Sequence, residues 1–266
     1  MNRIEERMKA LSEKSEKAFI TYVTAGLPDY DKTAELVHIQ EKAGVDVIEL
    51  GVAFSDPIAD GPVIQDASYR ALLAGADIEK TFDLVKRVRG EGAELPVILM
   101  LYTNTIYHYG IKEFLSRASE VGVDGLIVPD MPFEEQAEIR KALGEGGYDI
   151  ILIQLVSPVS KARVPGILED ARGFVYCVSA MGVTGQAGEY HKNIADYLAS
   201  VKSVSKIPVM MGFGITSPSD VAPFIGSIDG CIVGTHFIKL LEEEGYAAAA
   251  AEKYCSDFKK GLVKLS

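Results

Sequence analysis

The chain has 266 residues, of which 48% are hydrophobic and 24% charged, enough to bury a sizeable core as one large domain or two smaller ones. Its 27 lysines and arginines against 38 aspartates and glutamates give a net charge of −11, which argues against duplex nucleic acid or an anionic membrane as a partner. The three cysteines lack metal-binding spacing, so no metal is expected. The N-terminus is too charged for a secretory signal, and no apolar run approaches the roughly 20 residues of a membrane span. A cytoplasmic protein is therefore expected.

Short, nearly continuous apolar runs recur along the chain and predict buried parallel strands. Such runs, rather than strict alternation of polar and apolar residues, are typical of strands that are covered on both faces. The predicted strands are 18–24, 45–50, 96–102, 124–129, 149–155, 173–179, 208–213 and 230–234.

Amphipathic segments separate these runs, and several of them end in glycine, the usual residue just past a helix C-terminus. Eight strand–helix units in about 250 residues are typical of a (β/α)8 TIM barrel. A doubly wound open sheet is the alternative, but it rarely carries eight regular repeats without a second domain. We therefore predict an α/β fold, a single TIM-barrel domain over residues 1–266.

Two segments depart from the repeat. A helix over residues 2–15 precedes the first strand and is expected to cover the bottom of the barrel. The interval after the second strand is about twice the usual repeat, and it holds an extended loop, followed by the helical segment QDASYRALLAG (65–75). Active sites of such barrels lie at the C-terminal ends of the strands, so this loop is a candidate for function.

Glu49, the first candidate catalytic residue, lies at the end of the second predicted strand, just before the extended loop. Side chains alternate along a strand, so if Ile48 and Leu50 face the helices, Glu49 points into the barrel mouth. Among apolar side chains its pKa is expected to rise, and the carboxyl group would then carry a proton at neutral pH. From composition alone, a glutamate paired with a buried arginine or lysine is an equally good interpretation.

Two aspartates follow in the same loop. Asp60 lies within reach of the mouth, and a carboxyl group there in wetter surroundings would form an acid–base pair with Glu49. Turn chemistry is the alternative for both aspartates, because Asp-Pro and Asp-Gly are favoured loop dipeptides. For Asp56 by itself the turn interpretation is preferred.

Glycine-rich segments follow the last three predicted strands, at GVTG (182–185), GFGITSPSDV (212–221) and GTHFIKLLEE (234–243). Glycine lets the backbone approach a ligand, and the N–H groups of a helix N-terminus favour an anion. Loops after strands 7 and 8 are the recurrent phosphate site of TIM barrels. Because three glycine-rich segments follow three adjacent strands, the sequence predicts a ligand that carries a phosphate group.

Four segments together carry a resemblance to a known family. ELGVAFSDPIADGPVIQ (49–65), FITYVTAGLPD (19–29), FVYCVSAMGVTG (174–185) and MGFGITSPSDV (211–221) resemble the tryptophan synthase alpha chain. The likeness spans the whole chain in order, and the motif ELGxxFSDPxADGP is long and highly specific.

The resemblance implies a lyase that splits indole-3-glycerol phosphate by a retro-aldol reaction into indole and glyceraldehyde 3-phosphate. Glu49 matches the proton-shuttling carboxylate, and Asp60 matches the carboxylate that accepts the indole N–H bond. The phosphate ligands are implied to be Gly185, Gly214, Gly234 and Thr235. The indole pocket is implied to consist of Tyr22, Met100, Ile127, Ile153, Tyr176, Thr184 and Phe213.

The resemblance also implies a partner, a beta chain that binds pyridoxal phosphate (PLP) and receives the indole, whereas this chain is expected to hold no cofactor. Asp56 lies where that partner is contacted. Three positions depart from the family pattern, with Ala53 for a usual proline, Tyr22 for phenylalanine and Met100 for leucine.

Two rival functions follow from other interpretations of the same barrel. Another phosphate-binding enzyme of the same pathway would need a catalytic lysine at an inner strand end, and the predicted strands carry none there. A non-catalytic barrel that binds a partner would not need Glu49 or Asp60, and both are present.

Overall fold

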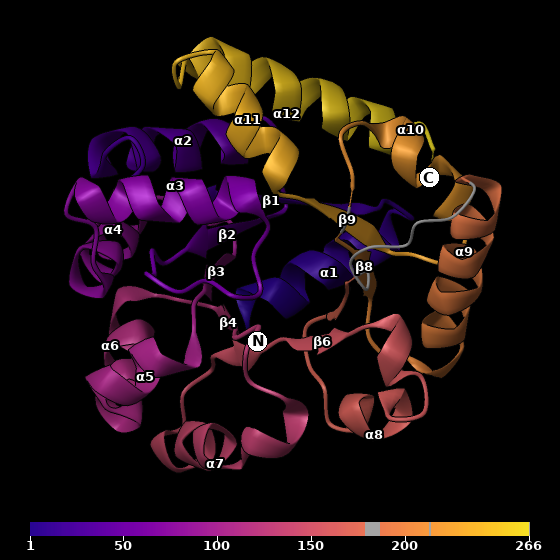
Figure 1. The fold of residues 1–266 in the computed structure, drawn as a ribbon, viewed down its shortest axis with the longest axis horizontal. Helices are drawn as coiled ribbons and strands as arrows, with labels where there is room; N and C mark the ends of the chain where they lie inside the picture. The colour runs from indigo at the N-terminus through magenta and orange to yellow at the C-terminus, as the bar shows by residue number, and fades with distance from the viewer. Residues whose placement is uncertain (179–186, 213, 266) are drawn as a thin grey trace.

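The strands form one parallel sheet that curls into a ring, as the computed structural model shows for residues 1–178, 187–212 and 214–265 (Figure 1). Within those ranges the sheet has nine strands in the order β5-β4-β3-β2-β1-β9-β8-β7-β6. They are β1 (Ala18–Thr24), β2 (Val47–Gly51), β3 (Val97–Met100), β4 (Gly125–Ile127), β5 (Ile151–Leu152), β6 (Gln154–Val156), β7 (Val175–Cys177), β8 (Val209–Met211) and β9 (Gly230–Val233).

The two strands at the ends of this order, β5 and β6, are separated by a single residue, Ile153. The ring is therefore closed by the chain itself, and β5 and β6 are two parts of the strand predicted over 149–155. All eight predicted strands are present, and the prediction of a TIM barrel is confirmed.

Helices surround the ring (Figure 1). Two of them begin at aspartate caps, where Asp29 and Asp77 each accept a hydrogen bond from a backbone N–H of the first turn. No helix in the described ranges is both long and apolar enough to cross a membrane. The α-helices are α1 (Arg3–Glu13), α2 (Tyr30–Lys42), α3 (Pro62–Leu73), α4 (Ile78–Gly90), α5 (Thr103–Tyr109), α6 (Ile111–Val121), α7 (Ala137–Gly146), α8 (Val164–Leu168), α9 (Ala187–Val204), α10 (Pro218–Val221), α11 (Thr235–Glu243) and α12 (Ala248–Val263), and the 3-10 helices are η1 (Phe133–Glu135), η2 (Pro158–Ser160) and η3 (Ala222–Phe224).

The alternation of side chains along the strands divides the core into two layers. In β2, Val47 belongs to the inner layer of the barrel, whereas Ile48 and Leu50 pack in the layer between the sheet and the helices. All three side chains are completely buried. Burial of each such side chain contributes about 1.5–3 kcal/mol, so register is strongly specified: a slip by one residue would reverse both layers.

Helix α1 closes the bottom of the barrel, as predicted for residues 2–15, and lies across the centre of the ring in Figure 1. Its residues Ile4, Met8 and Leu11 are buried in the same cluster as the inner layer. The amide of Asn2 donates hydrogen bonds to the carbonyls of Asp124 (2.9 Å) and Asp149 (2.6 Å), before β4 and β5. Helix α1 thus removes the lower end of the inner layer from water.

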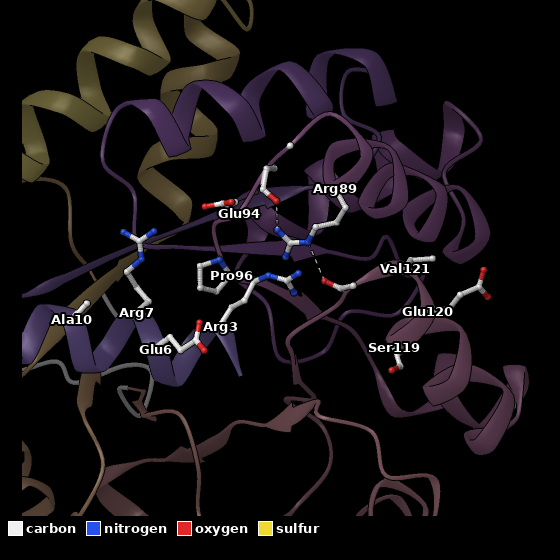
Figure 2. A pocket seen from close by; sticks show the side chains of 13 residues that line it. Arg3, Glu6, Arg7, Ala10, Arg89, Glu94, Pro96, Ser119, Glu120 and Val121 are labelled. Carbon is white, nitrogen blue, oxygen red and sulfur yellow. Dashed lines mark hydrogen bonds between the residues drawn. The ribbon is translucent and has the colours of Figure 1, made fainter. Parts of the chain in front are cut away.

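An open cleft of about 960 Å³ lies on this lower side, between α1 and the ends of α4 and α6 (Figure 2). The guanidinium group of Arg89 donates hydrogen bonds to backbone carbonyls there and pairs with Asp124 at 2.7 Å. Asp124 also pairs with Arg3 at 2.8 Å. These charged side chains bind one another and the backbone near the N-terminal ends of the strands, so their role is structural. The cleft lies away from the carboxyl ends of the strands.

Candidate active site

Glu49 lies in β2 and points into the upper part of the barrel, as predicted. Its neighbours Ile48 and Leu50 face the helices, and Glu49 itself is 1% exposed. The equally weighted alternative, a buried salt bridge, is not seen: among the described residues no cation pairs with Glu49, and its Oε1 atom accepts no hydrogen bond. Burial without a compensating charge raises the pKa of Glu49 to about 8. The carboxyl group is therefore protonated at neutral pH.

Asp60 lies in the loop between β2 and α3, and it is only partly buried. Burial raises the pKa of Asp60 to about 6, and a hydrogen bond from the Tyr102 hydroxyl to Oδ2 (2.8 Å) opposes that rise. At neutral pH Asp60 is mostly ionised while Glu49 is mostly protonated. Their environments thus separate the two pKa values, which is how a pair of carboxyl groups divides acid and base roles.

Two tyrosines lie within electrostatic reach of both carboxyl groups. Tyr22 in β1 is paired in register with Glu49, and Tyr176 lies in β7. Burial raises the pKa of both phenols, and the charges of Asp60 and Glu49 raise each of them further. Because an electrostatic effect of this kind falls with distance, the two carboxyl groups and the two phenols converge on one region.

Two glycines make room for these rings. A Cβ atom at Gly51 would lie 1.9 Å from the Tyr22 hydroxyl, and one at Gly212 would lie 1.9 Å from the Tyr176 ring. Each tyrosine side chain therefore occupies the space that a Cβ atom at the glycine would need. This arrangement explains glycine directly after the Glu-Leu pair of β2 and directly after β8.

Five of the seven side chains predicted to form an apolar pocket belong to, or pack against, the apolar clusters inside the barrel. Tyr22 and Met100 share one apolar cluster, and Met100 also packs against the inner layer. Ile127, Ile153 and Tyr176 belong to or contact that inner layer. Two further predicted members, Thr184 and Phe213, lie outside the described residues.

A cavity of about 250 Å³ lies at the ends of β8 and β9, and the side chain of Tyr176 forms part of its lining. Three of the four predicted phosphate ligands line it: Gly214, Gly234 and Thr235. Gly214 has a positive φ of 64°, which favours glycine, and Thr235 is the first residue of α11. The fourth, Gly185, lies outside the residues that the structure describes. The geometry suits an anion at the α11 N-terminus.

Three side chains in this region are not among the residues predicted from the sequence. Tyr102 contacts Asp60, while His236 and Lys239 line the cavity at the α11 N-terminus. Lys239 follows Thr235 by four residues, one turn along the helix on the same face, and this spacing could have identified it. Tyr102 could not be found in this way, because nothing local relates it to Asp60.

Asp56 is exposed, in a part of the extended loop where Ser55, Ile58 and Ala59 are exposed as well. The loop is held at its beginning by Ser68 of α3, which accepts from the Phe54 N–H (2.8 Å) and donates to the Phe54 carbonyl (3.0 Å). Beside Asp56, the side chain of Ile58 is 80% exposed. The expectation that Asp56 faces outward agrees with this exposure. In the described part of the chain, no cluster of histidine, cysteine and acidic residues suits a metal ion.

Comparison with known proteins identifies relatives over more than nine-tenths of the chain. The family model for the tryptophan synthase alpha chain matches residues 8–263. A tryptophan synthase alpha chain from Lachnospira eligens is 60% identical over 262 residues, which are 98% of this chain and 99% of the relative, and one from Alkaliphilus metalliredigens is 44% identical over 91% of this chain and 90% of its own. The crystal structure of tryptophan synthase subunit alpha from Legionella pneumophila superposes with a TM-score of 0.88 at 34% identity, covering 98% of both chains.

Proposed function

We propose that Glu49 and Asp60 carry out the reaction of the family to which this chain belongs, that of the tryptophan synthase alpha chain. The chain is the lyase subunit that cleaves indole-3-glycerol phosphate into indole and glyceraldehyde 3-phosphate. What remains to be assigned is the part that each side chain plays.

Cleavage of this carbon–carbon bond requires a proton on the indole ring carbon and the loss of a proton from the adjacent glycerol hydroxyl. We assign the first proton to Glu49, which is protonated at neutral pH because burial raises its pKa to about 8. Once the ring carbon is protonated, the bond breaks, its electrons return to the ring, and the hydroxyl becomes an aldehyde as its proton passes to Glu49. Glu49 is therefore protonated at the end of the cycle, as it was at the start, and the reaction neither consumes nor releases a net proton.

Asp60 is assigned to the indole N–H group. Protonation of the ring carbon places positive charge on the indole nitrogen, and an ionised carboxylate there stabilises that charge more than it stabilises the neutral substrate. The observation that carries this proposal is the different surroundings of the two carboxyl groups: Glu49 is 1% exposed with no partner for its Oε1 atom, whereas Asp60 is partly buried and accepts a hydrogen bond from Tyr102. Burial accordingly raises the pKa of Glu49 to about 8 and that of Asp60 to about 6.

The two ends of the substrate fit the two remaining parts of the site. We place the indole ring against Tyr22, Met100, Ile127, Ile153 and Tyr176, with Thr184 and Phe213 as further proposed contacts. The phosphate is assigned to the cavity that Gly214, Gly234 and Thr235 line, with Gly185 as a fourth proposed ligand. Lys239, which makes no ion pair in the described part of the chain, supplies a positive charge to this cavity.

A beta chain is the proposed partner, and PLP is proposed to belong to that chain, with no cofactor held here. Exposed apolar side chains on the segments that follow the strands support a protein interface at the barrel mouth: Ile58 is 80% exposed, Val159 in η2 is 86% exposed and Tyr107 in α5 is 46% exposed. Asp56 lies in the same loop as Ile58. The cytoplasm is the proposed location, which agrees with three free, buried cysteines.

The assignment is tested by measuring indole release from indole-3-glycerol phosphate with the purified chain. Asp60→Asn is expected to lower turnover by at least about tenfold, since it removes the charge that stabilises the protonated ring. Asp83→Asn, which changes an exposed aspartate of α4, is the matched control and should keep the rate. A full rate in Asp60→Asn would remove Asp60 from the mechanism, whereas substrate binding without any indole release by the unaltered chain would favour a partner-binding scaffold.

A further inference from the structure

We infer that Tyr102 is the positioning residue of Asp60: its hydroxyl holds one carboxylate oxygen, so that the other is presented to the indole N–H. The inference rests on the role proposed for Asp60 above. It concerns a residue outside the sequence motifs, which acts through Asp60 and not on the reacting atoms.

A backbone N–H group determines which way the hydrogen bond between Tyr102 and Asp60 runs. The Tyr102 hydroxyl accepts from the backbone N–H of Ala59 at 3.0 Å, so its own hydrogen is available for Oδ2 of Asp60, 2.8 Å away. Within the described ranges, no hydrogen bond reaches the other oxygen, Oδ1. One carboxylate oxygen is thus occupied, and within the same ranges the other has no partner and can accept from a donor on the substrate.

The phenol is itself held from both sides. Tyr102 is 3% exposed, and its ring stacks on Phe54 with the centroids 5.0 Å apart and the planes 17° from parallel. The next residue, Thr103, donates both its backbone N–H and its hydroxyl to Asp130, each at 2.9 Å. A side chain that is fixed at its ring and at its backbone can orient a carboxylate without losing further conformational freedom.

The surroundings of Asp60 give this hydrogen bond a large effect on the pKa of Asp60. Among the described residues, the phenols of Tyr22, Tyr102 and Tyr176 lie close enough to Asp60 for its charge to raise their pKa values, and no cation pairs with Asp60. Burial raises the pKa of Asp60, and the Tyr102 hydrogen bond is the effect that lowers it. Removal of the hydroxyl should therefore raise the pKa of Asp60 above about 6 and leave less of the reactive carboxylate at neutral pH.

The test compares Tyr102→Phe with Tyr109→Phe. The control also removes a hydroxyl that donates to a carboxylate, that of Glu79, but at the surface. We expect Tyr102→Phe to lower kcat by roughly ten- to a hundredfold at neutral pH with little change in KM, and to move the acid limb of the pH–rate profile upward by about half a unit or more. Tyr109→Phe should leave the rate and the profile unchanged. An unmoved acid limb in Tyr102→Phe would overturn the inference, even if the variant were less stable.

A double variant separates this inference from the role of Asp60. If Tyr102 acts through Asp60, then Tyr102→Phe combined with Asp60→Asn should be no slower than Asp60→Asn alone. Multiplying losses would overturn the inference while leaving Asp60 in the mechanism, and a full rate in Asp60→Asn would instead overturn the proposed function. Should Tyr102→Phe fold poorly, 3,5-difluorotyrosine at position 102 keeps the hydroxyl and makes it a stronger donor. The acid limb should then move to lower pH, and no movement would contradict the inference.

Discussion

Replacing Glu49 by glutamine removes the ionisable group and keeps the size of the side chain. As the proposed acid and base, Glu49 is expected to contribute roughly 10²–10⁴-fold to the rate, so indole release should fall by that factor in Glu49→Gln. The apolar pocket and the phosphate cavity do not involve this carboxyl group, so binding of glycerol 3-phosphate should change little. Substantial indole release by the variant would refute the assignment.

The same substitution has a thermodynamic consequence that does not depend on the substrate. The pKa of Glu49 is raised from an ordinary 4.5 to about 8 on folding. Between these values the unfolded chain releases the proton while the folded chain keeps it, so stability falls as the pH rises and levels off above about pH 8. From this group alone, the free energy of unfolding should be lower by about 3 kcal/mol near pH 8.5 than near pH 5.5.

Urea unfolding of both proteins at these two pH values measures the effect. Glutamine leaves a buried amide to be satisfied, which costs about 1–3 kcal/mol at every pH, so the absolute stability of Glu49→Gln is not the criterion. The criterion is the difference between the two pH values, which should be about 3 kcal/mol smaller in the variant than in the original protein. Equal differences would show that Glu49 is already ionised near pH 5.5, and the argument for a protonated acid would fail.

Three further predictions concern the phosphate cavity, the partner surface and the base of the barrel. Lys239→Met should raise KM for indole-3-glycerol phosphate about tenfold with kcat nearly unchanged, whereas Lys86→Met, at an exposed position of α4, should not change KM. Steady-state kinetics measure both, and an unchanged KM in Lys239→Met would exclude a role of Lys239 in phosphate binding. Val159→Asp should weaken binding of a beta chain by at least about tenfold in calorimetry, because a charge would be buried in the proposed interface, and unchanged affinity would move the interface elsewhere. Ile4→Ala should lower the free energy of unfolding by about 2–5 kcal/mol, since Ile4 is completely buried under the barrel. Val204→Ala, at a position that is 44% exposed, should lower it by less than about 0.5 kcal/mol. Equal urea midpoints for the two variants would contradict the packing of α1.

The direction of the Glu49 side chain could be predicted from the sequence because alternation along a strand is a local property. Once Ile48 and Leu50 are assigned to the helix layer, the strand leaves Glu49 no other side. The choice between a lone carboxyl group and a buried salt bridge was not local. It depended on whether any cation from another strand or loop reaches Glu49, and in the described part of the chain none does.

The sequence by itself determined the number of strand–helix repeats, the helix under the barrel and the end of the barrel where the site lies, because hydrophobic period, glycine positions and segment lengths are all written along the chain. Only the tertiary structure decided what meets Asp60. Tyr102 lies 42 residues further along, and its hydroxyl reaches Asp60 because β2 and β3 are neighbours in the sheet and because the loop between β2 and α3 folds back over the end of β3. The course of this loop depends on contacts such as those of Phe54 with Ser68 and Tyr102, which join residues of different elements and which no local pattern in the sequence predicts.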